Sequence, residues 1–514
     1  MNEEVTQWDF GGFNPRFLGV SLRFGSPATY KVFRQYLESD EVSTALGQEA
    51  SRVEIAIRSV LDHEIRHYHD SLISPYGAIA FRHRLEAMVD GMQALNCARD
   101  LKGTCVPSPL LRWVLMNEEG RALQLREWNS AVPCPQGGVW VPPGIPHRTQ
   151  EYFYDWEPRV ADTSGLPTER QFELFLDAAV HAYLDLSVMT STKGATGFLP
   201  CHFFEVTALT SQVQAILQSQ GLMPALEFLR FLLDSPLPYA DLWRRFLQLG
   251  LLVEKQKRAD VDEGSLVLAA LPDVMNLGVW CLLGSYERER LEASPAKRFD
   301  RLLRFLVEDY KNPMNHTTVI EDLWAHWDQG TGVIAWKDSL KSLLVYGERG
   351  LRRIATLKRE WGGDMSVPRH AETVLETYTE EQRSVVGYLL ESPELFADLN
   401  IYLNQAQGRL PIPLLRVELD GFCIPISTIS GPNLRYVTRF EHEGETYTNR
   451  YVIDPGVLQR SKADDFMDAA LRVESMAQWC DAALANLSIP WETQVAARAG
   501  LEDITGKRLL MIVG

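Results

Sequence analysis

Positive charge is scarce in this sequence of 514 residues. Its 51 Lys and Arg residues stand against 68 Asp and Glu residues, which gives a net charge of -17 at pH 7. Such a charge repels phosphate backbones and anionic lipid surfaces. The composition therefore argues against nucleic acid and membranes as partners.

Long apolar runs and a leader-like start are also missing. The longest apolar stretch, residues 266–284, is interrupted by Pro272, Asp273 and Asn276, which would be costly inside a membrane-spanning helix, so we interpret it as buried core. Residues 1–12 have neither a basic start nor an apolar run and do not resemble a secretory signal. These absences predict a cytoplasmic protein.

Paired cysteines and several familiar motifs are absent as well. The seven cysteines never form a CxxC pair, which fits free thiols in a reducing compartment. The sequence has no GxSxG, P-loop or GxGxxG motif, so serine-hydrolase, phosphate-binding and dinucleotide-binding functions have no local support.

Helical periodicity dominates what is present. Apolar residues at three- and four-residue steps predict one long amphipathic helix over residues 48–72. Residues 74–77 break it, and a second helix over about 78–98 is expected to form an antiparallel hairpin with the first. Further helices are predicted at 29–38 and 464–486, and helical patterns prevail from 169 to about 400.

Strand patterns are shorter. Residues 17–24 predict a strand, and residues 111–128 predict a β-hairpin around a turn at 117–120. Residues 133–149, rich in Pro and Gly, predict a loop. Two more hairpins are expected, one turning at Asp420-Gly421 and one around Gly444. The fold class is therefore α+β and mostly helical.

One motif carries specific chemistry. Residues 63–67 read His-Glu-Ile-Arg-His, an HExxH sequence within the first long helix. Positions i and i+4 share a helix face, so His63 and His67 could bind one metal ion while Glu64 points at its open position. Zinc lowers the pKa of a bound water to about 7, and a neighbouring carboxylate can take its proton.

This motif resembles the metal-binding signature of the zincin metallopeptidases. The resemblance covers roughly the first 220 residues and implies that His63 and His67 are zinc ligands and that Glu64 is the general base. In the gluzincins, the zincins that use a glutamate, the third ligand comes from a later helix.

Two glutamates compete to be this third ligand. Glu205 is the only charged residue between 194 and 226, and a lone carboxylate on an apolar helix is costly to bury unless a positive group meets it. FFEVTA also resembles the third-ligand helix of gluzincin-like proteins. Glu86 is the alternative, because Glu86 and Asp90 resemble the ExxxD pattern whose aspartate supports a zinc-bound histidine. An Arg82–Glu86 ion pair would explain the same residues. We favour Glu205 because the cost of burying its lone charge is a stronger argument than the sequence spacing of Glu86 from the motif.

Other residues around the motif are candidates for supporting roles. Asp70 lies on the ligand face and could accept a hydrogen bond from a ligand histidine, or could be a solvated residue near the helix end. Arg66 could reach solvent or pair with Asp62 or Asp70, each four residues away. His69 points away from His67 and is not expected to be a ligand. His202 shares a helix face with Glu205 and is a candidate for contacting substrate or the oxyanion.

Together these patterns predict a zinc metallopeptidase whose chain has three regions. The predicted regions are a zincin-like catalytic region over 1–250, a helical region over 251–400 and an α+β region with hairpins over 401–514. The expected partners are a protein or peptide substrate and a regulatory protein. Two alternatives remain, a helical scaffold with an inert motif and a zinc hydrolase acting on a non-peptide bond.

Overall fold

The computed structural model of the chain describes most of the helical sequence. Three predicted elements, the loop at 133–149, the helix at 29–38 and most of the helix at 464–486, lie outside the described residues. The described residues are 11–14, 19–24, 48–131, 163, 165–257, 263–284, 294–309, 319–360, 366–406, 410–411, 413–419, 422–426, 429–430, 435–442, 445–452, 469, 473, 476–477, 480, 502 and 504–511.

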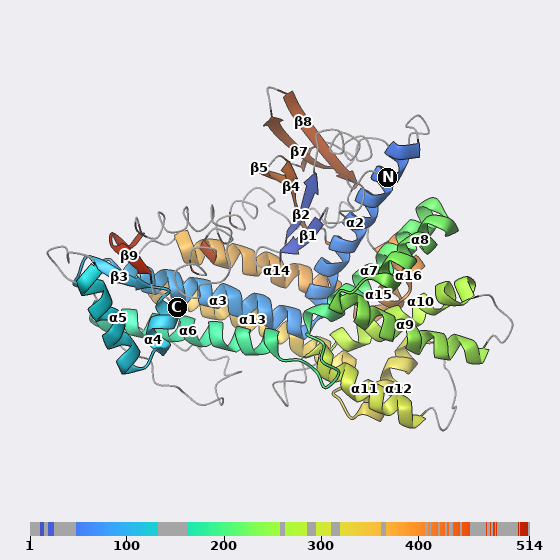
Figure 1. The fold of residues 1–514 in the computed structure, drawn as a ribbon, viewed down its shortest axis with the longest axis horizontal. Coiled ribbons are helices and arrows are strands. Elements are labelled where there is room, and N and C mark those ends of the chain that lie inside the picture. The colour runs from blue at the N-terminus through green and yellow to red at the C-terminus, as the bar shows by residue number, and fades with distance from the viewer. Residues whose placement is uncertain are drawn as a thin grey trace. The chain divides into compact units, whose positions relative to one another are not determined.

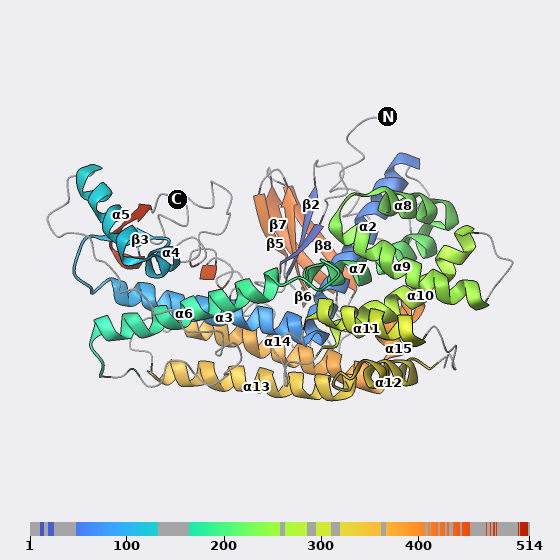
Figure 2. The ribbon, with the colours of Figure 1, turned by 60° about the horizontal axis from the view of Figure 1, so that its bottom comes forward.

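Helices make up most of the described structure (Figures 1 and 2), as the sequence predicts for a mostly helical α+β fold. The helices are α2 (Gln48–Ile73), α3 (Pro75–Ala98), α4 (Leu110–Leu115), α5 (Glu118–Ala131), α6 (Thr168–Ser191), α7 (Cys201–Gln220), α8 (Leu222–Asp234), α9 (Pro238–Lys257), α10 (Glu263–Leu282), α11 (Pro295–Asp309), α12 (Ile320–Thr331), α13 (Trp336–Glu360), α14 (Ser366–Glu391), α15 (Glu394–Ala397), α16 (Leu399–Ile401) and the π-helical turn η3 (Tyr402–Ala406).

The chain divides into two compact units. Unit 1 consists of Met1–Ile79, Thr190–Tyr346 and Thr377–Met467, and unit 2 of Ala80–Met189, Gly347–Glu376 and Asp468–Gly514. Unit 1 thus draws on all three regions expected from the sequence, 1–250, 251–400 and 401–514, so the units and those regions divide the chain differently. The predicted regions remain a prediction.

Unit 1 contains a four-stranded sheet of order β1-β2-β4-β5. Strands β1 (Gly11–Asn14) and β2 (Gly19–Phe24) are antiparallel, and β2 pairs in parallel with β4 (Leu414–Leu419) from far along the chain. β4 and β5 (Phe422–Ile426) are antiparallel, with Leu419 opposite Phe422. The predicted strand near residues 17–24 and the predicted hairpin around Asp420-Gly421 are confirmed.

A second, three-stranded sheet of unit 1 contains the other late hairpin. Strands β7 (Arg435–His442) and β8 (Glu445–Val452) are antiparallel and His442 lies opposite Glu445, which confirms the hairpin around Gly444. The short strand β6 (Ile429–Ser430) pairs with β7.

Helix α2 forms where its apolar periodicity predicts. Its buried side chains include Leu61, Ile65 and Tyr68, which lie on the i, i+4 and i+7 positions of one stripe. The antiparallel hairpin with α3 is wrong. Helical hydrogen bonds run on through the junction, from the Ser74 N–H to the Asp70 carbonyl and from the Ala78 N–H to the Ser74 carbonyl. Pro75 has no N–H to donate, so the junction lacks one helical hydrogen bond but contains no reversing turn.

Helix α7 is the other long helix that bears on the site, and it packs against both α2 and α10. Its close approach to α10 depends on Gly278, where a Cβ atom would lie 2.8 Å from Thr207 Cγ2. We expect Gly278→Ala to lower the free energy of unfolding by about 1–2 kcal/mol, since overpacking outweighs the gain in helix propensity. Urea denaturation would measure this change.

Gly387 in α14 provides a matched control for that substitution. A Cβ atom at Gly387 meets nothing within 4 Å, so Gly387→Ala is expected to be neutral or stabilising. Equal effects of the two substitutions would contradict the packing argument.

The β-hairpin predicted at residues 111–128 is wrong, because this segment forms α4 and α5. The residues taken for a turn begin a helix instead: the Asn117 side chain accepts the Gly120 N–H at 2.7 Å, and Glu118 and Glu119 occupy the acidic first turn. Trp113 and Trp128 stack on each other with centroids 5.3 Å apart. The pattern Asn-Glu-Glu is typical of a helix N-terminus. The prediction of a turn was wrong because it gave more weight to the glycine that follows, Gly120.

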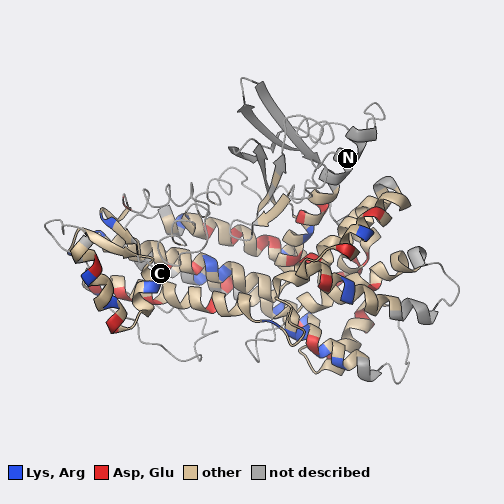
Figure 3. Ribbon diagram, in the orientation of Figure 1, with Lys and Arg blue, Asp and Glu red and all other residues tan. Residues whose placement is uncertain are grey.

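Unit 2 is built on long helices, with parts of α3, α6, α13 and α14 running alongside one another (Figures 1 and 2). Strands β3 (Cys105–Ser108) and β9 (Arg508–Met511) form a parallel pair. Acidic and basic residues are interspersed along the described helices (Figure 3). None of the described helices combines the length and apolar character that a membrane crossing requires.

Candidate metal centre

Helix α2 brings His63 and His67 together one turn apart. Their Nε2 atoms lie 3.0 Å from each other and their rings meet edge to face, with centroids 4.6 Å apart. Both side chains are largely buried. The HExxH spacing therefore places two imidazole nitrogens at one point, as the sequence predicts for a helical motif.

Glu205 completes this group from the first turns of α7. Its Oε2 lies 3.3 Å from His63 Nε2 and its Oε1 lies 3.4 Å from His67 Nε2. The exposed fraction is 9% for the His67 side chain and 31% for the Glu205 side chain. The group is therefore open to solvent on the side of the glutamate. Within the described part of the chain, these three residues are the group whose geometry suits a metal ion.

The spacing of the three residues fits zinc. A tetrahedral zinc ion with bonds of about 2.0–2.1 Å holds its ligand atoms roughly 3.3 Å apart. The two histidine Nε2 atoms, 3.0 Å apart, are close to that value, and each has a different oxygen of Glu205 at 3.3 or 3.4 Å. Two imidazoles and one carboxylate are also a donor set that zinc accepts in catalytic sites, where three protein ligands leave a fourth position open.

The electrostatics of the group tie its members to one another. Burial lowers the pKa of His67, but the carboxylates of Glu205, Glu64 and Asp70 outweigh it and raise that pKa to about 9. Burial raises the pKa of Glu205, yet the two histidines, His67 foremost, hold it well below its usual range. Without a metal, the proton and the carboxylate charge stabilise each other.

This coupling predicts how zinc affinity depends on pH. Zinc binds neutral imidazole. At pH values below its pKa of about 9, the His67 ring of the metal-free protein carries a proton that zinc must displace. Affinity is therefore expected to rise about tenfold per pH unit from pH 7 towards pH 9 and then to level off. Competition with a chelator, corrected for the chelator's own protonation, would measure it. An affinity that stays constant from pH 7 to 9 would contradict the raised pKa.

Glu64 is a buried carboxylate beside the two histidines. Burial raises its pKa, against the opposing effect of the neighbouring histidines and of the Phe13 backbone N–H, which donates a hydrogen bond to it. Its Oε2 has no hydrogen-bond partner among the described residues. A carboxylate with a raised pKa and a free oxygen is suited to accept a proton.

Strand β1 covers Glu64, a feature that the sequence did not reveal. A Cβ atom at Gly11 would lie 2.6 Å from Val60 Cγ1 and 3.1 Å from Glu64 Oε1, so only glycine allows this approach. The Phe13 ring stacks on His67 with centroids 6.5 Å apart. Nothing local in Gly-Gly-Phe distinguishes it from an ordinary strand, because its role depends on the pairing of β1 with β2.

The alternative ligand Glu86 is not part of the converging group. It accepts a hydrogen bond from Arg82 Nε at 3.1 Å on its own helix α3, which is the ion pair that offered the competing explanation. Asp90 follows one turn later on α3 and is buried. The supporting role predicted for Asp90 depends on Glu86 as a ligand and remains a prediction.

Three neighbours of the ligands had predicted roles: Asp70 is fully buried and lacks its predicted histidine partner, His69 is turned away from the metal group as expected, and the substrate or oxyanion role of His202 stays a prediction. Asp70 is hydrogen-bonded to Arg66 and Thr207 and not to a ligand histidine. His69 bonds to Tyr402 Oη and the Pro411 carbonyl, each at 2.8 Å, and so does not face the metal group, as expected. His202 Nδ1 accepts the Leu199 N–H at 3.4 Å, and burial lowers its pKa.

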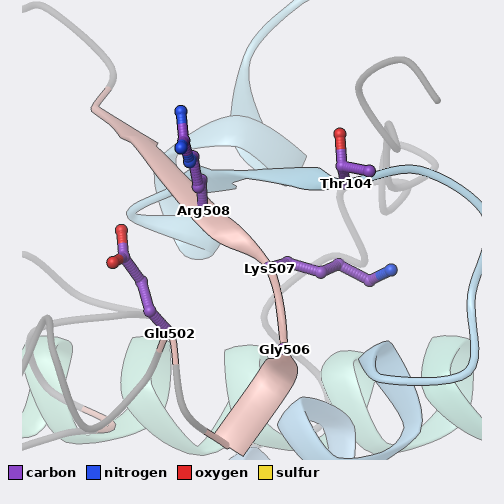
Figure 4. Close-up of a pocket in the computed structure, with 5 residues that line it drawn as sticks. All are labelled: Thr104, Glu502, Gly506, Lys507 and Arg508. Carbon is purple, nitrogen blue, oxygen red and sulfur yellow. The ribbon is translucent and has the colours of Figure 1, made fainter. Parts of the chain in front are cut away.

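A hollow of about 410 Å³ lies in unit 2, away from these residues in sequence (Figure 4). The Lys507 side chain extends away from Glu502 and Arg508, and its Nζ donates to the carbonyls of Leu101 and Gly103 at 2.7 and 2.6 Å. Its ammonium thus stabilises the turn after α3. The lining residues are Thr104, Glu502, Gly506, Lys507 and Arg508.

Comparison of the chain with protein-family models, with curated proteins and with solved structures gave no match.

Proposed function

We propose that this protein is a zinc-dependent metallopeptidase. The observation that carries the proposal is the convergence of His63, His67 and Glu205 from two helices, with the carboxylate of Glu64 beside them. Sequence spacing alone would bring the two histidines together, but Glu205 reaches them from a distant segment. That a carboxylate arrives at this point supports a site built for a cation.

The proposed reaction needs residues that bind the metal and a residue that transfers a proton. A bound zinc ion supplies Lewis acidity, polarising a carbonyl and making a water more acidic. His63, His67 and Glu205 hold the ion, and Glu64 takes the proton of the attacking water at its free Oε2 and later gives it to the leaving amine. Burial raises the pKa of Glu64 above its usual value, which favours the step in which it takes up a proton.

The opening beside Glu205 supports hydrolysis of a substrate that approaches from solvent. The preference for a peptide bond rests on the zincin-like motif, while the same residues could act on an ester or a non-peptide amide. A cytoplasmic location and a regulatory partner remain part of the proposal.

The experiment has two steps. Protein purified without added zinc is analysed by elemental mass spectrometry, and about one zinc per chain is expected. The zinc-loaded protein is then tested on peptide, ester and non-peptide amide libraries. Cleavage of peptides supports the proposal, cleavage of other bonds alone would replace it with a different hydrolase, and a folded protein without metal would favour a scaffold.

A further inference from the structure

A buried polar network joins the two helices that carry the metal group. Asp70 of α2 is completely buried and accepts a hydrogen bond from Thr207 Oγ1 of α7 at 2.5 Å. Asp70 lies three residues after His67, and Thr207 lies two residues after Glu205. This bond therefore connects α2 and α7 within one turn of a ligand on each helix.

Arg66 also holds the Asp70 carboxylate, and its Nε donates to Oδ2, the same oxygen that accepts from Thr207. Its Nε lies 2.9 Å from Asp70 Oδ1, and both side chains are fully buried. Arg66 Nη1 also donates to the Phe396 carbonyl at 3.0 Å, and the guanidinium lies 4.4 Å from the centroid of Tyr402. A buried arginine with three such partners has little freedom, so it fixes the orientation of Asp70.

Thr207 is equally constrained on its own helix. Its hydroxyl lies 2.9 Å from the Phe204 carbonyl, and its methyl group faces Gly278 of α10, where there is no room for a Cβ atom. One side-chain rotamer thus satisfies both the packing and the hydrogen bond to Asp70. An increase of about 1 Å in the separation of α2 and α7 would break that hydrogen bond.

We propose that Asp70 and Thr207 are positioning residues, whose hydrogen bond holds α2 and α7 at the separation that lets Glu205 share one metal ion with His63 and His67. This inference rests on the metal site of the proposed function, but not on the bond that the enzyme cleaves. Outer partners of this kind, which fix the ligands without touching the metal, typically change metal affinity about 10–100-fold when they are removed.

Thr207→Val tests the inference, with Thr210→Val as its matched control. Both substitutions replace a buried hydroxyl of α7 by a methyl group, but Thr210 accepts from Trp243 Nε1 at 3.0 Å and does not bond to α2. Zinc affinity is measured by chelator competition, and the visible spectrum of the Co²⁺-loaded protein reports the geometry of the ligands. Thr207→Val is expected to weaken zinc binding about 10–100-fold and to alter the Co²⁺ spectrum. Thr210→Val should leave both unchanged.

Two further measurements make the result unambiguous. Thr207→Ser retains the hydroxyl and is expected to restore affinity and spectrum, and thermal unfolding of the metal-free proteins reports any general loss of stability. Wild-type affinity in Thr207→Val, or an equal loss in Thr210→Val, overturns the positioning role. If the wild-type protein itself binds no zinc, the proposed metal site fails, and this inference fails with it. Zinc binding without peptidase activity overturns the proposed reaction alone.

Discussion

Glu205→Gln is expected to weaken zinc binding by about 100–1000-fold and to abolish hydrolysis at ordinary zinc concentrations. The free energy of zinc binding to small domains is about 10–16 kcal/mol, shared by four ligands. One ligand therefore contributes about 2.5–4 kcal/mol. A neutral amide also removes a charge that raises the pKa of His67, and the easier loss of that proton offsets only part of the weakening. Chelator competition and elemental mass spectrometry would measure the loss.

Glu86→Gln is the control for this result, since Glu86 was the alternative ligand. Glu86 pairs with Arg82, and we expect its substitution to leave the zinc content at the wild-type level. Loss of zinc in Glu86→Gln with retention in Glu205→Gln would reverse the assignment of the third ligand.

Glu64→Gln is expected to retain zinc and to lower the rate of hydrolysis by about 100–10,000-fold, the usual contribution of a general base. Glutamine has nearly the shape of glutamate and can still accept the Phe13 N–H, so the geometry of the site should survive. It cannot take a proton from water. Steady-state kinetics on a cleaved peptide, together with zinc content, would separate a lost base from a lost metal.

The two results expected from Glu64→Gln must occur together. Full activity in this variant would exclude Glu64 as the base, and loss of zinc would mean that its carboxylate helps to hold the metal. Glu205→Gln provides the comparison, because it should lose the metal and the activity at once.

The parts of the site that follow from local physics could be predicted from the sequence. The 3.6-residue periodicity of α2 placed His63 and His67 on one face, and the lone charge of an apolar helix singled out Glu205. The pairing of Arg66 with Asp70 also follows from helical spacing. Each of these arguments needs only neighbours on the same helix and the cost of burying a charge.

What depends on distant segments could not be predicted. The contact of Gly11 with Glu64 requires β1 to lie on α2, and β1 is held there by a sheet whose partner strand β4 comes from residues 414–419. The bond between Asp70 and Thr207 likewise requires the register of α7 on α2. No pattern within a single helix or strand records these pairings, because they arise from tertiary packing.

The anchoring of α2 by residues 396–411 bears on how the molecule could be divided. A fragment that stops at residue 250 would retain the motif histidines and Glu205, yet it would leave Arg66 and His69 without the carbonyls and the phenol that they bind in the whole chain. A buried guanidinium that loses its acceptors costs several kcal/mol. A fragment over residues 1–250 is therefore expected to be less stable than the same residues in the whole chain, because helix α2 is completed by contacts that become available only when residue 411 has been synthesised.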